Sequence, residues 1–119
     1  MMQLHALIRR KDGMSRDEFL HYWHNVHGPL IRDTPALADR LLRYEQHPSH
    51  PKDRSGFDGV AVQHFASWED FLAMLEPPHG EVMSADEANF IDRKDIVVVF
   101  TDDPIVMVER PRGDVSGDG

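Results

Sequence analysis

The sequence predicts an α+β protein with the element order βαββαβ, and a short internal repeat carries most of that prediction. Residues 15–20 and 67–72 both read Ser, two residues, an acid, Phe and Leu, and each copy lies between two strand-like segments. The order strand, helix, strand therefore occurs twice, which is typical of the ferredoxin-like, split βαβ arrangement. Right-handed crossovers would place the helices on one face of a four-stranded antiparallel sheet.

The first strand is predicted over residues 3–9, because apolar and polar residues alternate there. Residues 11–13 read Lys-Asp-Gly, which is typical of a turn. Ser15 then begins a helix, and Glu18 completes a capping box in which each side chain satisfies a backbone N–H.

The first helix carries an apolar stripe and a predicted end. Phe19, Trp23 and Val26 follow one another at helical spacing, so we expect all three on the buried side. Gly28-Pro29 interrupts the run and is expected to end the helix, with an irregular stretch after it through Pro35.

The same signals predict the rest of the chain as one domain over residues 1–110. The predicted elements are a strand at 41–47, a loop at 48–58, a strand at 60–65, a capped helix from Ser67 to the Pro77-Pro78 pair, a short helix at 81–91, a strand at 96–100 and a short extension at 105–108. Residues 111–119 are polar and glycine-rich and are expected to form a mobile tail.

The last strand predicts a homodimer. Residues 96–100 read Ile-Val-Val-Val-Phe, apolar at odd and even positions, so both faces of this strand need cover. In a ferredoxin-like sheet it is also an edge strand, and an exposed apolar edge favours pairing. Two such sheets packed by their open faces would form a dimeric α/β barrel.

Composition excludes several classes of protein. The net charge of −8, without a basic stripe, argues against nucleic acid as a partner. The absence of cysteine excludes disulfides, thiolate metal sites and a Cys nucleophile. The longest apolar run has five residues, too short to span a membrane, and the N-terminus lacks a signal-peptide core, so the sequence predicts a cytoplasmic protein.

The histidines are the candidates in this sequence for metal binding or proton transfer. His21, His24 and His27 are three residues apart, but they spread over too wide an arc of a helix to bind one ion, so no metal site is predicted. His27 borders the apolar stripe beside Gly28-Pro29, where a half-buried imidazole can take or give a proton near neutral pH. A structural role, with the ring bound to the last carbonyls of the helix, fits the same position.

Other polar or aromatic residues are candidates to bind a substrate with His27. Tyr44 lies mid-strand, where its phenol can hydrogen-bond a substrate oxygen. The remaining candidates are Tyr22 and Trp23 on the helix, which also suit the core, His5 and His64 on strands, and His47 and His50, which flank the predicted loop.

The run Phe-Leu-His-Tyr-Trp-His-Asn-Val-His-Gly-Pro-Leu at residues 19–30 resembles the signature of the EthD family. Residues 43–46, 58–61 and 86–92 resemble other segments of that family. The resemblance implies a dimeric barrel of ferredoxin-like protomers. The wider superfamily includes cofactor-free lactone isomerases, polyketide cyclases, dehydratases and quinone-forming monooxygenases. Its methylmuconolactone isomerases have a His at the position of His27 and a Tyr at that of Tyr44.

Together these observations predict a small cofactor-free enzyme that acts on an apolar, oxygenated ring compound such as a lactone or an aromatic polyketide. His27 would shuttle a proton and Tyr44 would polarise a carbonyl. Two alternatives stay open: a non-catalytic accessory protein that binds a small apolar or aromatic molecule, and a cofactor-free monooxygenase, which would agree with the oxidoreductase label of the EthD family.

Overall fold

The computed structural model describes residues 1–112; part of the predicted tail, residues 113–119, lies outside the described residues. In chain order the elements are β1 (Met2–Ile8), α1 (Arg16–Tyr22), the π-helical segment η1 (Trp23–His27), α2 (Gly28–Arg32), α3 (Pro35–Ala38), β2 (Arg43–Pro48), β3 (Gly59–Phe65), α4 (Trp68–Met74), α5 (His79–Glu87) and β4 (Val97–Asp102).

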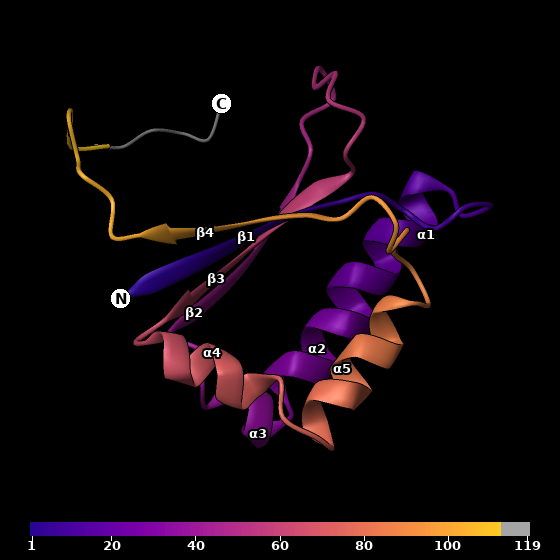
Figure 1. The fold of residues 1–119 in the computed structure, drawn as a ribbon. Helices are drawn as coiled ribbons and strands as arrows, with labels where there is room; N and C mark the ends of the chain where they lie inside the picture. Colours follow the sequence, from indigo (N-terminus) through magenta and orange to yellow (C-terminus); the bar gives the residue numbers. More distant parts are fainter. Residues whose placement is uncertain (113–119) are drawn as a thin grey trace.

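The strands form one antiparallel sheet in the order β2-β3-β1-β4, and the helices cover one of its faces (Figure 1). In the register of the central strands, Ala6 pairs with Ala61 on one side and with Val98 on the other. This topology confirms the predicted ferredoxin-like α+β fold, with β4 at one edge.

Both predicted helix caps are present. The Ser15 hydroxyl accepts the backbone N–H of Glu18 at 3.1 Å, and the Glu18 carboxylate accepts the N–H of Ser15 at 2.9 Å. In the second copy of the repeat, the Ser67 hydroxyl accepts the N–H of Asp70 at 3.2 Å. These short segments therefore begin the two helices that cross over the sheet.

The predicted end of the first helix at Gly28-Pro29 is wrong. The chain stays helical through η1 and α2 to Arg32, so α2 occupies the first part of the irregular stretch that was expected there, and α3 begins at its last residue, Pro35. The N–H of Gly28 binds the carbonyl of Trp23, five residues earlier, which is the π-helical pattern. Pro29 has no N–H and its ring crowds the carbonyl four residues before it, so a wider turn ahead of Pro29 relieves that conflict.

The wider turn changes which side chains are buried. Val26 is 41% exposed, so its place in the buried stripe was predicted wrongly, whereas His27 is only 5% exposed. Phe19, Trp23 and His27, at steps of four residues, make up the inner side of this helix instead. The π turn therefore places a histidine where α-helical spacing predicts a valine.

The core lies between the sheet and the helices in two clusters. One contains Met2, Ile31, Leu37, Phe65, Met74 and Met83, and the other contains Ile8, Phe19, Trp23, Phe90 and Ile91. The predicted extension at residues 105–108 forms no strand. Those four apolar residues, Ile105, Val106, Met107 and Val108, are 62–85% exposed.

Gly59 at the start of β3 gives the indole of Trp23 its space. A Cβ on Gly59 would lie 2.6 Å from Cζ3 and 2.7 Å from Cη2 of that ring. We expect Gly59→Ala to lower the free energy of unfolding by about 1–3 kcal/mol, the usual cost of overpacking. Urea unfolding measures this loss, and Trp23→Phe, which removes the clashing ring, should reduce it in a double-mutant cycle. An equal loss in both backgrounds would contradict this account.

Candidate active site

His27 is held at the inner end of η1 with one ring nitrogen engaged. Nδ1 of His27 lies 2.8 Å from Oδ2 of Asp86 on α5. The ring also packs against Phe90, with 4.8 Å between ring centroids. Because the carboxylate can only accept, Nδ1 carries the proton in this pair, and Nε2 of the neutral ring is the acceptor.

Asp86 is fixed by further donors. The Tyr22 hydroxyl donates to Oδ1 of Asp86 at 2.5 Å, and the amide of Asn89 donates to the same oxygen at 3.2 Å. The Asn89 amide also donates to the Tyr22 hydroxyl at 3.0 Å. These bonds fix the orientation of the Asp86 carboxylate, which in turn orients the His27 imidazole.

These contacts define the protonation of the pair. Burial lowers the pKa of His27 and outweighs the opposing effect of Asp86, so the imidazole is neutral at pH 7. Burial acts to raise the pKa of Asp86, but hydrogen bonds from Tyr22, His27 and Asn89 outweigh it, and this pKa is lowered. A neutral imidazole oriented by an ionised carboxylate is the arrangement of a general base.

An apolar cavity of about 440 Å³ lies between the sheet and the helices. This volume is in the range of sites for small organic molecules. The apolar lining comes from all four strands and from the helices, and among the lining residues the side chains that bear polar or titratable groups are Trp23, His27, Tyr44, Gln63, Ser84 and Glu87. His27 and Tyr44 thus border one cavity.

Tyr44 reaches the cavity from β2. Its hydroxyl accepts a hydrogen bond from Nε2 of Gln46 at 2.8 Å, so its own proton is available to another acceptor. Burial raises the pKa of Tyr44 to about 12, against the opposing effect of the Gln46 hydrogen bond. Tyr44 is therefore a protonated donor at neutral pH.

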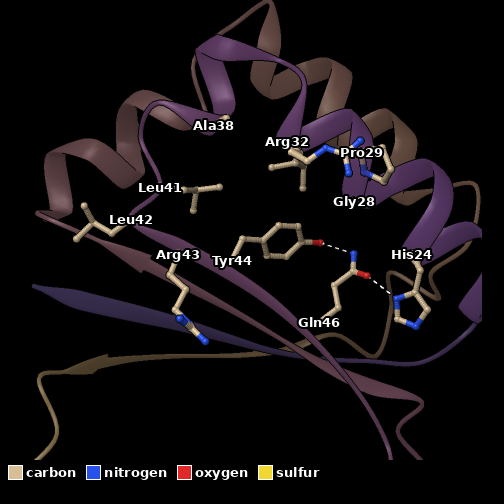
Figure 2. Close-up of a pocket in the computed structure, with 11 residues that line it drawn as sticks. His24, Gly28, Pro29, Arg32, Ala38, Leu41, Leu42, Arg43, Tyr44 and Gln46 are labelled. Carbon is tan, nitrogen blue, oxygen red and sulfur yellow. Dashed lines mark hydrogen bonds between the residues drawn. The ribbon is translucent and has the colours of Figure 1, made fainter.

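Gln46 ties Tyr44 to the π-helical turn. Figure 2 shows the Tyr44 hydroxyl directed at the Gln46 amide, whose oxygen faces His24 at 2.6 Å. Nε2 of Gln46 also donates to the carbonyl of Trp23 at 2.9 Å. A Cβ at position 28 would lie 2.9 Å from that nitrogen, so Gly28 allows this approach. His24, Gly28, Tyr44 and Gln46 line a second, more polar groove of about 500 Å³, which shares Tyr44 and Ile31 with the apolar cavity.

Glu87 is the one carboxylate that lines the apolar cavity among the described residues. Burial raises its pKa, Arg93 opposes this rise, and the charge of Asp86 adds to it. Within residues 1–112 its carboxyl forms neither a hydrogen bond nor an ion pair with another side chain. Sequence reasoning missed both Glu87 and its neighbour Asp86, although both lie in the segment 86–92 that resembles the EthD family.

The other predicted substrate-binding residues are distributed as follows. Trp23 lines the cavity, whereas Tyr22 lies behind it and holds Asp86. Successive strand residues point to opposite faces. Leu4, Ala6, Tyr44 and Gln63 line the cavity, so His5, His47 and His64 lie on the opposite face of the sheet and cannot join His27 within the protomer.

The three histidines on the open sheet face, and His50 in the loop after β2, have polar contacts of their own. His5 Nε2 lies 3.1 Å from the Thr101 hydroxyl, and His47 Nε2 lies 3.3 Å from Glu45. His64 Nε2 lies 4.0 Å from Glu45 as well. His50, after β2, accepts the backbone N–H of Lys52 in a local turn. None of these four lines the apolar cavity.

The described residues contain neither a candidate metal site nor a helix that could span a membrane. No group of three or more His, Asp or Glu side chains there could hold a metal ion. No helix within residues 1–112 is both long enough and apolar enough to cross a bilayer.

The fold and the cavity define a class: a ferredoxin-like α+β protein with a buried histidine–carboxylate pair beside an apolar cavity. The sequence model of the EthD domain matches residues 11–94, more than half of the chain. The chain therefore belongs to the EthD domain family, as the resemblance of residues 19–30 predicted. No curated protein matches the chain.

Solved structures with the same fold include an ethyl tert-butyl ether degradation (EthD) family protein from Bacillus halodurans, with a TM-score of 0.67 and 19% identity over 87% of this chain and 99% of the other. A dimeric ferredoxin-like protein of unknown function from Thermobifida fusca has a TM-score of 0.62 and 19% identity over 83% and 87%. A Nitrosomonas europaea protein described as an antibiotic biosynthesis monooxygenase has a TM-score of 0.59 and 16% identity over 87% and 98%. At these identities the similarity shows the fold alone.

Proposed function

We propose that the protein is a cofactor-free enzyme that moves a proton on an apolar, oxygenated ring compound, as an isomerase, cyclase or dehydratase does. The observation that carries the proposal is the hydrogen bond of 2.8 Å between His27 and Asp86 beside an apolar cavity. The pair is oriented and buried as a general base requires, and the cavity provides a place for an apolar ring.

In the proposed step, Nε2 of His27 takes a proton from a carbon next to a substrate carbonyl. The C–H electron pair moves into the new C=C bond, and the carbonyl oxygen becomes an enolate oxygen. Tyr44 donates a hydrogen bond to that oxygen, while Asp86 stabilises the imidazolium. In a substrate with a C=C bond next to that carbon, the enolate extends over both double bonds. The imidazolium then returns the proton to the far carbon of the original C=C bond, which moves that double bond next to the carbonyl, so the net reaction is an isomerisation without loss or gain of atoms.

A cofactor-free monooxygenase is the second candidate, supported by the similarity in fold to the Nitrosomonas europaea protein. The same base would then deprotonate an electron-rich phenol that reacts with oxygen directly. The cavity would also suit an accessory protein that binds such a compound without converting it.

A turnover screen separates these functions. The wild-type protein is incubated with neutral lactones and aromatic ketones and phenols, with product analysis and an oxygen electrode. Isomerisation without oxygen consumption is the expected result. Oxygen uptake in step with product would favour the monooxygenase, and saturable binding with no product from any compound would favour the accessory protein.

The pH dependence of this activity tests the pair itself. Only neutral His27 can act as a base, so kcat should fall as the pH drops through a pKa below about 6.5, the usual value for histidine. Asp86→Asn removes the charge that raises this pKa, so the acid limb should move to lower pH. The Asn amide would also donate to Nδ1, place the proton on Nε2 and lower the plateau rate about 10²-fold or more.

A pH–rate profile of both proteins measures the two effects. The matched control is Asp39→Asn, since Asp39 is an exposed residue outside the cavity. An unshifted acid limb in Asp86→Asn would contradict the pairing of Asp86 with His27 in the active enzyme.

We also propose that the enzyme is a homodimer joined by the open faces of the two sheets. Val97 and Val99, which lie on the open face of β4, are 44% and 48% exposed in the protomer, and the apolar residues 105–108 are exposed as well. The dimeric state of the Thermobifida fusca protein, which has the same fold, supports a homodimer. Burial of these apolar side chains would supply the driving force for association.

A further inference from the structure

Glu87 bears on the charge of the ligand, which the histidine–carboxylate pair does not restrict. The apolar cavity has no Arg or Lys among its described lining residues, and its titratable groups are His27, Tyr44 and Glu87. His27 is neutral and Tyr44 is protonated at pH 7. The cavity therefore offers hydrogen-bond donors and acceptors but no positive charge of its own.

The charges around Glu87 come from two neighbours. Asp86, the adjacent residue on α5, is ionised and raises the pKa of Glu87, while Arg93 lowers it from outside the cavity. The Arg93 guanidinium donates to the hydroxyl of Ser84 at 2.9 Å and to its carbonyl at 3.4 Å, and Arg93 does not line the cavity. Tyr44 is the other cavity group that interacts with the Glu87 charge.

A carboxyl in this position makes an anionic ligand costly. A ligand carboxylate would either face an ionised Glu87 in an apolar cavity, where like charges repel strongly, or require Glu87 to keep a proton at that site. An uncharged ketone, ester or lactone oxygen, in contrast, accepts a hydrogen bond from a donor such as the Tyr44 hydroxyl without placing a second negative charge beside Glu87.

We propose that Glu87 selects the substrate class: the cavity admits uncharged oxygenated ring compounds and rejects the same compounds when they bear a carboxylate. This inference rests on the proposed function for its biological meaning, but it concerns binding alone. It separates neutral lactones and ketones from carboxylated lactones.

The test uses a matched pair of probes. Coumarin is an uncharged aromatic lactone, and coumarin-3-carboxylate is the same ring with one carboxylate. Dissociation constants for both are measured near neutral pH by calorimetry with the wild type, with Glu87→Gln and with Glu81→Gln. Glu81 is an exposed residue on the same helix and lies outside the apolar cavity, so its variant is the matched control.

We expect the wild type and Glu81→Gln to bind coumarin at least about tenfold more tightly than its carboxylate, a difference of about 1.4 kcal/mol. Glu87→Gln should reduce that ratio to about threefold or less, chiefly by tighter binding of the carboxylate. Circular dichroism checks that the variants fold. If Glu87→Gln does not fold, Glu87→Met, which has a similar size and no charge, takes its place in the same comparison.

Three results would overturn the proposal: equal affinity of the wild type for both probes, a ratio that Glu87→Gln leaves unchanged, or no saturable coumarin binding at millimolar concentration. Failure of the proposed function has a different signature. In that case neither probe nor any other compound is turned over, while the preference for uncharged coumarin and its dependence on Glu87 persist.

Discussion

His27→Gln should lower kcat for a substrate of this enzyme by about 10²–10⁴-fold, the usual contribution of a general base. The glutamine amide can still donate a hydrogen bond to Asp86, and Asp86 keeps its bonds from Tyr22 and Asn89. The fold should therefore remain intact, and the dissociation constant for substrate should change only a few-fold. The loss would be specific to the chemical step.

Steady-state kinetics with a substrate from the turnover screen measures this loss. His21→Gln is the matched control, because His21 lies on the same helix but is exposed and outside the cavity. Full activity in His27→Gln would refute the assignment of His27 as the base. An equal loss in His21→Gln would show that the effect is one of helix stability.

Val99→Glu should convert the protein from dimer to monomer. Val98 lines the cavity on the helix-covered face, so Val99 lies on the open face, where His5 pairs with it across the sheet. It is 48% exposed in the protomer. A carboxylate buried in the dimer interface would lose its hydration at a cost of several kcal/mol, which the neighbouring His5 would offset only in part, and this cost would occur twice in a symmetric pair.

Analytical ultracentrifugation at micromolar concentration measures this change. The wild type and the control Val82→Glu should sediment as dimers of the 13.7 kDa chain, and Val99→Glu as a monomer. Val82 is 51% exposed on α5, in the helical layer, so a charge there leaves the open sheet face unchanged. A monomeric wild type, or dimers of Val99→Glu, would contradict the open-face dimer.

Local patterns in the sequence were enough to predict the fold. The Ser-x-x-acid segments at Ser15 and Ser67 act through hydrogen bonds within four residues, so their effect can be read from neighbours in the chain. Two similar strand–helix–strand units then leave few ways to order the sheet. The strand alternation also determines the face of each side chain once the register is known.

The site was only partly predictable because its decisive contacts join distant segments. His27 was identified from its place beside Gly28-Pro29, but its burial depends on the π-helical turn, which α-helical spacing does not anticipate. The partner Asp86 lies 59 residues away on α5, and no local pattern connects the two. For His5 and His64, the strand spacing predicted alternation but not which face of the sheet each side chain occupies. The register places both on the face away from His27.

The most direct test of proton transfer by His27 is deuterium incorporation followed by proton NMR. A neutral aromatic ketone or lactone that the wild type binds, and that bears hydrogen on a saturated carbon next to the carbonyl, is incubated in D2O, and the signal of that hydrogen is followed. The wild type should exchange this hydrogen far faster than the uncatalysed reaction, and His27→Gln should lose about 10²-fold or more of that acceleration. Bound ligands that exchange no faster than in buffer, or equally fast with His27→Gln, would contradict the account.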